Sequence, residues 1–333
     1  SIRRSSGHHR QEMHHSHPQK KTASAFDNAL PHAHREQSHP PRPLLVGERD
    51  SGTGGLQSLP LLCLDFPVDL ERLGEIVVTA AREELLPRFA RVERGRKADG
   101  SIITEADLVM QQRIAGELRR IRPDTVFLGE EMSTADQDEL LHRDKPLWCL
   151  DPLDGTGNFA AGIPCFAVSL ALLCGDQVDA AVVYDPSRDE CFSALRGQGA
   201  WLNGQGLSTP DSPARLQDAM AMVDLKRLPD PLIRALARNS PYRSQRSFGS
   251  VALDWCWIAS GRCQVYLHGG QKLWDYAAGQ LILTESGAVG GLLDDYAGDW
   301  LESPSLTPRI AIAATHADLL RQWRDWICAQ LRP

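Results

Sequence analysis

The pattern of apolar and polar positions predicts regular secondary structure from about residue 67 to the end of the chain. Between residues 67 and 86, apolar side chains recur at helical spacing among Glu and Arg, as at Leu73, Ile76 and Val77, which predicts an amphipathic helix. Short apolar runs bounded by turn residues predict strands. The predicted strands occupy residues 125–129, 147–151, 165–174, 177–185, 190–203, 263–267 and 309–314, and further helices are predicted at about 229–238, 250–261, 275–286 and 316–331. Strands and helices are mixed without regular βαβ alternation, so the predicted fold class is α+β.

Two local motifs support this interpretation. Thr104 and Asp107 form a capping-box pattern ahead of another predicted helix, whose apolar face includes Ile114. This capping role is by itself a sufficient structural explanation for both residues. Asn203-Gly204 is a dipeptide typical of a tight hairpin turn.

Composition indicates an ordinary globular protein. Of the 333 residues, 42% are hydrophobic and 24% are charged, so the chain can bury a sizeable core. A formal net charge of −7 does not indicate a nucleic-acid partner, although net charge alone does not exclude a local basic patch. The eight cysteines contain no C-x-x-C pair, and we interpret them as reduced thiols in a cytoplasmic protein. The longest nearly apolar stretch, residues 163–174, is too short to span a bilayer, so no membrane partner is expected.

The first 66 residues have a different composition. Eight of the eleven histidines lie there among Pro, Ser and Gln, with almost no periodic apolar pattern, so we expect a disordered extension over residues 1–66. The segment has no continuous apolar run like that of a secretory signal. Metal binding by its irregularly spaced histidines is the alternative interpretation.

The candidate chemistry is concentrated in one short segment. Asp151 and Asp154 stand at the end of a predicted strand, which Pro152 should terminate. Gly155 and Thr156 then supply a turn with free backbone amides. Carboxylates that face amides at a strand end suit a divalent cation bridging to a phosphate. A surface turn is the alternative, since Asp and Gly are common turn residues.

Three other segments accompany this motif. One apolar run ends at Glu130 and Glu131, the segment W-D-x-A-A-G carries Asp275 near a helix start, and an upstream segment carries Thr104 and Asp107. Together with D-P-L-D-G-T-x-N-F, these segments resemble the inositol monophosphatase family of magnesium-dependent, lithium-sensitive phosphatases. The resemblance runs from about residue 67 to near the C-terminus.

The resemblance implies a fold and a division of the chain. The expected fold is a layered α-β-α-β-α sandwich of the inositol monophosphatase and fructose-1,6-bisphosphatase type. Residues 67–210 would form an N-terminal α+β half that carries most metal ligands. Residues 211–333 would form a C-terminal α/β half that contributes Asp275 and substrate contacts.

The resemblance also implies a set of oxygen ligands for two or three Mg²⁺ ions, with Mn²⁺ as a possible substitute. These ligands are Glu130, Asp151, the backbone carbonyl of Leu153, Asp154 and Asp275. Oxygen donors without Cys or His at ligand spacing select Mg²⁺ or Mn²⁺ over zinc. Glu130 is preferred to its neighbour Glu131 because it directly follows Gly129, as in the family's G-E-E. For Asp275, a simple helix N-cap is the alternative.

Catalytic roles follow from the same resemblance. Thr156, hydrogen-bonded to Asp107, is implied to orient and deprotonate an attacking water, and Glu130 is assigned to catalysis beside them. The amides of Gly155 and Thr156 are implied to cradle the phosphate. Lys97 would complement the phosphate charge, and a solvated loop lysine is the alternative.

A haloacid dehalogenase mechanism is disfavoured by spacing. In that class, a second Asp follows the nucleophilic Asp by two residues. Here Asp154 follows Asp151 by three residues with a proline between them. The spacing favours metal-activated water over an aspartyl-phosphate.

The expected activity is therefore Mg²⁺-dependent phosphomonoester hydrolysis of a small metabolite, with inositol monophosphate as the first candidate. The alternatives within the family are 3′(2′),5′-bisphosphate nucleotides, histidinol phosphate and fructose bisphosphate. Inositol-preferring members typically present a Glu where this chain has His268, seven residues before Asp275. Arg246 and Ser250 match positions beside the substrate, although an arginine there could equally belong to a structural ion pair. The family suggests a homodimer, and some members act instead as regulatory partners of the transcription machinery.

Overall fold

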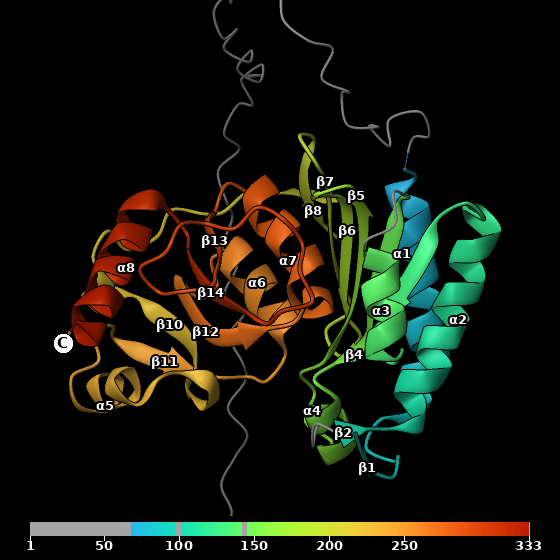
Figure 1. The fold of residues 1–333 in the computed structure, drawn as a ribbon, viewed down its shortest axis with the longest axis horizontal. Helices are drawn as coiled ribbons and strands as arrows, with labels where there is room; N and C mark the ends of the chain where they lie inside the picture. The colour runs from blue at the N-terminus through green and yellow to red at the C-terminus, as the bar shows by residue number, and fades with distance from the viewer. Residues whose placement is uncertain (1–67, 98–101, 142–144, 333) are drawn as a thin grey trace, which may run out of the picture. The chain divides into compact units, whose positions relative to one another are not determined.

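The computed structural model describes residues 68–97, 102–141 and 145–332, which form two large β-sheets, a two-stranded sheet and the helices packed on them (Figure 1). The predicted disordered extension at residues 1–66 lies outside the described residues. The helices are α1 (Leu70–Ala80), α2 (Glu105–Ile121), α3 (Thr134–Leu141), α4 (Thr156–Ala161), α5 (Asp230–Arg238), α6 (Val251–Ala259), α7 (Leu273–Glu285) and α8 (Ala317–Leu331). Shorter helical turns are η2 (Ala81–Leu85), η3 (Leu86–Arg88), η4 (Leu216–Asp218) and η5 (Leu225–Arg227).

A seven-stranded sheet carries the first part of the described chain. Its strands, in spatial order, are β3 (Val126–Gly129), β4 (Leu147–Asp154), β5 (Ala167–Cys174), β6 (Gln177–Asp185), β7 (Glu190–Leu195), β8 (Gly199–Leu202) and β9 (Gln205–Leu207). β3 and β4 run parallel, and the other neighbouring pairs are antiparallel. The predicted hairpin turn is confirmed, because Asn203 and Gly204 both have positive φ and join β8 to β9.

A five-stranded sheet carries the rest. Its spatial order is β11 (Ser244–Arg246), β10 (Met220–Asp224), β12 (Val265–Gln271), β14 (Arg309–Ala314) and β13 (Val289–Leu293). β10 pairs in parallel with both β11 and β12, and β14 pairs antiparallel with both β12 and β13. A separate pair, β1 (Gly95–Arg96) and β2 (Ile102–Ile103), lies near α4. The predicted division between residues 210 and 211 falls in the chain between the two large sheets, and it stays a prediction.

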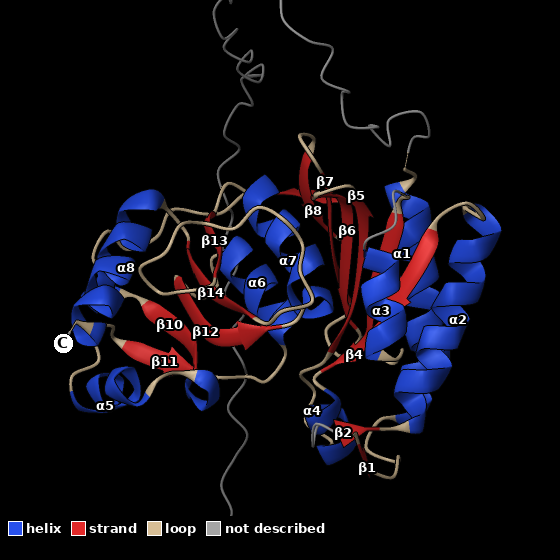
Figure 2. Cartoon of the chain, in the orientation of Figure 1, coloured by secondary structure: helices blue, strands red, loops and turns tan. Residues whose placement is uncertain are grey.

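The helices and sheets alternate in layers (Figure 2). α1 and α2 cover one face of the seven-stranded sheet, α6 and α7 fill the space between the two sheets, and α5 and α8 cover the far face of the five-stranded sheet. Three buried apolar clusters correspond to these three helical layers. α6 and α7 are buried almost all round because they face a sheet on each side. The α-β-α-β-α arrangement expected from the resemblance is confirmed.

Several details differ from the sequence-based expectations. β4 does not stop at Pro152 but continues to Asp154, with a register irregularity against β5 between Asp151 and Asp154. Such an irregularity accommodates a residue that has no N–H to donate. The pattern of apolar residues also failed to predict helix α3 and the short strands β10, β11 and β13. Cys174 is disulfide-bonded, so the expectation of eight reduced thiols was wrong at this residue. None of the helices in the described ranges has the length and apolar character that a membrane crossing requires.

Candidate active site

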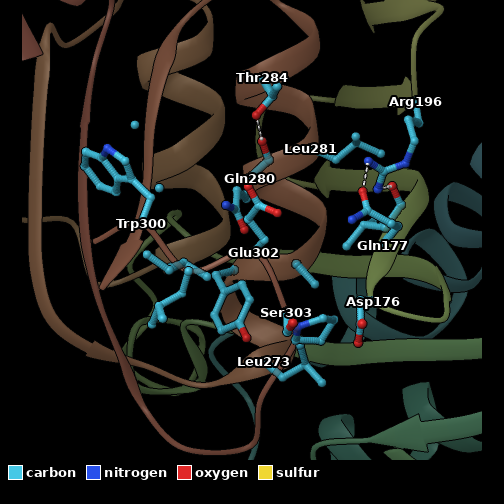
Figure 3. Close-up of a pocket in the computed structure, with 18 of the residues that line it drawn as sticks. Asp176, Gln177, Arg196, Leu273, Gln280, Leu281, Thr284, Trp300, Glu302 and Ser303 are labelled. Atoms are coloured by element: carbon cyan, nitrogen blue, oxygen red, sulfur yellow. Dashed lines mark hydrogen bonds between the residues drawn. The ribbon is translucent and has the colours of Figure 1, made fainter. Parts of the chain in front are cut away.

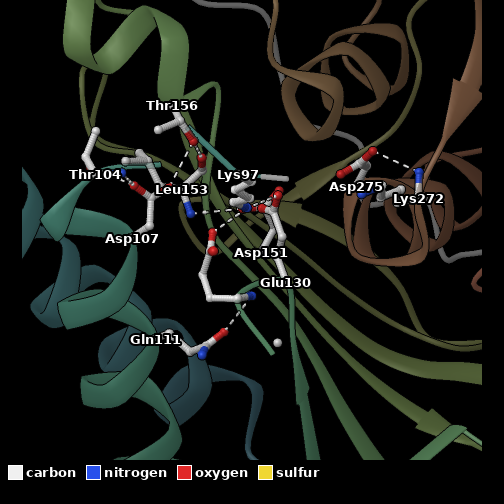
Figure 4. A network of polar contacts seen from close by, with 12 residues as sticks. Lys97, Thr104, Asp107, Gln111, Glu130, Asp151, Leu153, Thr156, Lys272 and Asp275 are labelled. Carbon is white, nitrogen blue, oxygen red and sulfur yellow. Dashed lines mark hydrogen bonds and ion pairs between the residues drawn. The ribbon is translucent and has the colours of Figure 1, made fainter. Parts of the chain in front are cut away.

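A cavity of about 660 Å³ opens where the ends of β4 and β12 approach the first turns of α4 and α7. Its walls include most of the predicted site residues, namely Glu130, Asp151, Leu153, Asp154, Gly155, Thr156, His268 and Asp275. Figure 4 shows how the carboxylates from separate elements lie toward one another. The fold therefore brings together residues that lie up to 145 positions apart in the chain, from Glu130 to Asp275.

The end of β4 holds two of the acids in fixed positions. The buried Asp151 accepts a hydrogen bond at Oδ1 from the backbone N–H of Leu153, at 3.0 Å. Asp154 Oδ2 accepts from the Ser250 hydroxyl at 2.6 Å and from the Ala252 N–H at 2.7 Å, both at the start of α6. Both carboxylates are thus oriented by donors rather than left to rotate.

Gly155 makes the turn from β4 into α4. Its φ of +90° lies in the left-handed region that favours glycine. A Cβ at this position would also approach the carbonyl oxygen of Cys165 to 2.9 Å. A side chain at residue 155 would therefore displace the turn that carries Thr156 into the cavity wall.

Glu130 and Glu131 lie beyond the end of β3 and share one cation. Lys97 Nζ lies 2.7 Å from Oε1 of each glutamate. The Glu130 side chain is 19% exposed and lines the cavity, whereas the Glu131 side chain is 3% exposed and is absent from the lining. Burial, opposed by Lys97, raises the pKa of Glu131 to about 7. Burial alone would lower the pKa of Lys97, but the two glutamates together raise it.

Asp275 lies in the first turn of α7. The N-cap residue of this helix is Lys272, so the alternative of Asp275 as a simple N-cap was wrong in position. Asp275 is the third helical residue, and its Oδ2 completes a capping box by accepting from the backbone N–H of Lys272 at 2.9 Å. Asp275 nevertheless also lines the cavity opposite Asp151 and Asp154. The capping bond aims the carboxylate, and the two interpretations are compatible.

The clustered acids repel one another in a buried setting. Burial, with Glu130 and the neighbouring aspartates, raises the pKa of Asp151 well above its usual range. Burial raises the pKa of Asp154 to about 6, although its hydrogen bonds oppose the shift. Burial and the charge of Asp154 raise the pKa of Asp275 to about 8. Such a cluster is stabilised by added positive charge.

The donor set suits a hard divalent cation. Side-chain and carbonyl oxygens at the cavity wall are the ligands that Mg²⁺ prefers. Within residues 68–97, 102–141 and 145–332, no three His, Cys, Asp or Glu side chains already converge as a complete metal site. The hydrogen bonds explain this, because Glu130 faces Lys97, Asp154 faces Ser250 and Asp275 faces the backbone of Lys272.

Thr156 and Asp107 meet beside the acid cluster. Thr156 Oγ1 lies 2.9 Å from Asp107 Oδ1 and 2.9 Å from the Leu153 carbonyl oxygen. The second oxygen of Asp107 accepts from both the backbone N–H and the hydroxyl of Thr104, at 2.7 and 2.6 Å. Burial, opposed by these bonds, raises the pKa of Asp107. The capping box is confirmed, and it leaves one carboxylate oxygen of Asp107 for Thr156.

Three predicted substrate contacts have informative placements. His268 lines the cavity, but the nearly buried ring is bonded to protein groups. Ser250 is fully buried and supports Asp154. Arg246 lies exposed on the edge strand β11, does not line the cavity, and donates to the carbonyl oxygen of Gln245. Sequence reasoning missed Asp224, Lys226 and Arg227, because β10, the short strand that ends at Asp224, has little sequence signal.

A second cavity of about 450 Å³ lies beside α7, away from these residues (Figure 3). Arg196 pairs with Asp179 at its edge, and Glu285 accepts from the backbone N–H groups of Gly197 and Gly199. None of the predicted site residues lines this cavity. We assign it no part in the chemistry.

Known proteins resemble this chain over most of its length. The model of the "Inositol monophosphatase family" matches residues 65–332. The chain is 36% identical over 227 residues to "Inositol monophosphatase 1" of Solanum lycopersicum, which covers 66% of this chain and 81% of that protein. It is 35% identical over 211 residues to "Nus factor SuhB" of Haemophilus influenzae, which covers 62% and 76%. An IMPase structure from Thermotoga maritima has a TM-score of 0.67 at 26% identity and covers 78% of this chain and 96% of that one.

Proposed function

The chain belongs to the inositol monophosphatase family and is a phosphoric monoester hydrolase, and from this premise we propose that the 660 Å³ cavity is its active site. The observation that carries the proposal is the acid cluster of Glu130, Asp151, Asp154 and Asp275 at the cavity wall. The raised pKa values of its three aspartates mark a site that requires added positive charge.

We propose that Glu130, Asp151, the Leu153 carbonyl, Asp154 and Asp275 hold two or three Mg²⁺ ions, with Mn²⁺ as a substitute. Magnesium supplies charge neutralisation, polarisation of the phosphoryl oxygens and a more acidic water. Asp151 is 2% exposed and experiences the charges of Glu130, Asp154 and Asp275, which supports a bridging role. Glu130 is preferred to Glu131 because its side chain faces the cavity.

Thr156 and Asp107 are proposed to orient the attacking water and accept its proton. The Thr156 hydroxyl has one hydrogen, which can be donated to Asp107 at 2.9 Å. The hydroxyl oxygen is then free to accept a hydrogen bond from water in the cavity. Asp107 cannot rotate away, because Thr104 holds its other oxygen through two bonds.

The phosphate is proposed to lie against the turn at Gly155 and Thr156, whose backbone lines the cavity beside the acids. Lys97 pairs with Glu130, so its contribution to phosphate binding would require that pair to open. Ser250 acts through Asp154 in this proposal.

We propose a small phosphorylated metabolite as the substrate. The family alone makes inositol monophosphate the first compound to test, followed by 3′(2′),5′-bisphosphate nucleotides, histidinol phosphate and fructose bisphosphate. A second candidate function is regulatory binding to the transcription machinery, favoured by the similarity to a protein named as a Nus factor. A homodimer and a cytoplasmic location are further proposals that rest on the family resemblance.

The test is phosphate release from a panel of these esters with Mg²⁺, with EDTA as the control. Mg²⁺-dependent release that EDTA abolishes is the expected result. Absence of release from every ester, together with capture of transcription proteins by an Asp151→Asn variant, would instead favour the regulatory function.

A further inference from the structure

The cavity lining also carries basic side chains. Besides the acid cluster, it includes residues from the end of β10, from η5 and from β12, which we call the second wall. This wall contributes Lys226 and Arg227, both exposed, beside Asp224 and His268. Acids that suit cations and bases that suit an anion therefore line the same cavity.

Asp224 and His268, in the second wall, are already hydrogen-bonded to protein groups. His268 Nδ1 accepts from the Gly270 N–H at 3.2 Å, so Nε2 carries the hydrogen and donates to Asp224 Oδ2 at 3.1 Å. Asp224 Oδ1 accepts from the Lys226 N–H at 3.0 Å. The bond from His268 lowers the pKa of Asp224 to about 2. The His268 ring therefore offers no open nitrogen, whereas the Asp224 carboxylate, 25% exposed, keeps lone pairs and faces Arg227.

Arg227 is positioned by the backbone against which it packs. A Cβ added at Gly269 would collide with the Arg227 carbonyl group, so η5 lies directly on β12 at this point. The Arg227 stem continues over Gly270, where an added Cβ would lie 3.4 Å from Cδ. Its Nη1 lies 3.6 Å from Asp224 Oδ2, while the side chain is 51% exposed. Nη1 also lies 3.4 Å from His268 Nε2, so protein groups hold the guanidinium at the cavity wall while about half of the side chain stays exposed.

Charge balance indicates what this wall would bind. If the acid cluster bound the phosphate through Mg²⁺, the alcohol portion of the ester would share the cavity with Arg227 and Lys226. Guanidinium groups bind carboxylates and phosphates through charge-assisted hydrogen bonds. With a neutral alcohol in the cavity, the N–H groups of Arg227 and Lys226 would find no anionic partner on the ligand and would bond to water.

We propose that Arg227, assisted by Lys226, forms an anion subsite, and that the substrate carries a second anionic group, phosphate or carboxylate, on its alcohol portion. This inference rests on the proposed phosphatase function and narrows its substrate class. It favours bisphosphates and phosphorylated acids over inositol monophosphate.

The test uses two matched substrate pairs with the full-length chain and Mg²⁺. The first pair is 3-phosphoglycerate and glycerol 3-phosphate, which differ by a carboxylate. The second is fructose 1,6-bisphosphate and fructose 1-phosphate, which differ by a phosphate. In at least one pair, the more anionic member should have a kcat/KM about 10- to 100-fold higher, mainly through a lower KM. The pair that shows the preference identifies the source of the anion.

Arg227→Gln should reduce this preference to within about threefold of unity, and Arg227→Lys should retain part of it. Arg238→Gln, at an exposed arginine of α5 that does not line the cavity, should leave the preference unchanged. Hydrolysis of both members of each pair with equal kcat/KM would overturn the anion subsite and leave the phosphatase function standing. A preference that survives Arg227→Gln would also overturn it. No Mg²⁺-dependent hydrolysis of any ester would overturn the proposed function and the subsite together.

Discussion

The Thr156 hydroxyl lies 2.9 Å from Oδ1 of Asp107, although 49 residues separate them in the chain. The contact joins the first turn of α4, at the end of β4, to the first turn of α2. Asp107 serves both as the partner of its own helix cap and as the acceptor for Thr156. A proton taken from water at Thr156 therefore has a defined carboxylate beside it.

Removal of this hydroxyl should reduce turnover without preventing binding. Thr156→Ala is expected to lower kcat by on the order of 10²–10⁴-fold, because a positioned proton acceptor contributes about that much. Thr156→Ser keeps a hydroxyl and should recover most of the loss. Steady-state kinetics, with calorimetric titration of Mg²⁺, would check both variants. Weakened Mg²⁺ binding that matches the loss in rate would point to a ligand-positioning role instead.

Oxygen from water should appear in the released phosphate. In a single turnover in ¹⁸O-water, the proposed attack by water labels phosphate and leaves the protein unlabelled. Mass spectrometry of both products would measure the label. Label in an aspartate carboxylate, or a trapped phospho-aspartate, would require covalent catalysis and contradict the roles of Thr156 and Asp107.

Asp151→Asn should abolish detectable turnover while leaving the fold intact. Replacement of one acid in a repelling cluster relieves unfavourable charge in the metal-free protein, so its melting temperature should hold or rise. Asp211→Asn, at an exposed aspartate outside the cavity, is the matched control. Near-normal activity of Asp151→Asn at physiological Mg²⁺ would rule out the bridging role.

Stability of the metal-free protein should fall as pH rises. The pKa values of Asp154 and Asp275 are raised to about 6 and about 8, whereas an unfolded aspartate has a pKa near ~3.9. The folded state therefore binds these protons more tightly than the unfolded state does. The contribution of this difference to the free energy of unfolding is fully present below pH ~4 and is lost as the pH rises toward ~8. Magnesium replaces the protons, so the rise in melting temperature caused by Mg²⁺ should be larger at pH 8 than at pH 5. Thermal scans with and without Mg²⁺ would test this, and a rise that shrinks with pH would contradict it.

Ser250→Ala should weaken metal binding more than substrate binding. Ser250 donates to Asp154 at 2.6 Å from a fully buried position, so its loss would loosen a proposed ligand. We expect Mg²⁺ affinity to fall by about 10-fold or more, as is usual for a group that orients a ligand. Ser260→Ala removes a hydroxyl that donates to carbonyl oxygens of its own helix, those of Cys256 and Trp257, and serves as the control. A change confined to the substrate KM would restore Ser250 to the substrate contacts.

Local sequence patterns predicted a large part of the fold. The helical periodicity before Leu85, the apolar runs of the central strands and the Asn203-Gly204 turn specify elements through contacts close in the chain. The acids of D-P-L-D-G-T and W-D-x-A-A-G identified the family and the oxygen-only donor set. These features could be predicted because each depends on residue type and short spacing.

Only the tertiary structure decided which groups face the cavity and which are already bonded. It placed Ser250 behind Asp154 and gave both ring nitrogens of His268 hydrogen-bond partners within the protein. These contacts depend on how elements far apart in the sequence pack together, and local residue spacing does not specify that packing. Arg227 reaches the cavity wall because the backbone of η5 packs directly on Gly269 of β12, which lies 42 residues further along the chain.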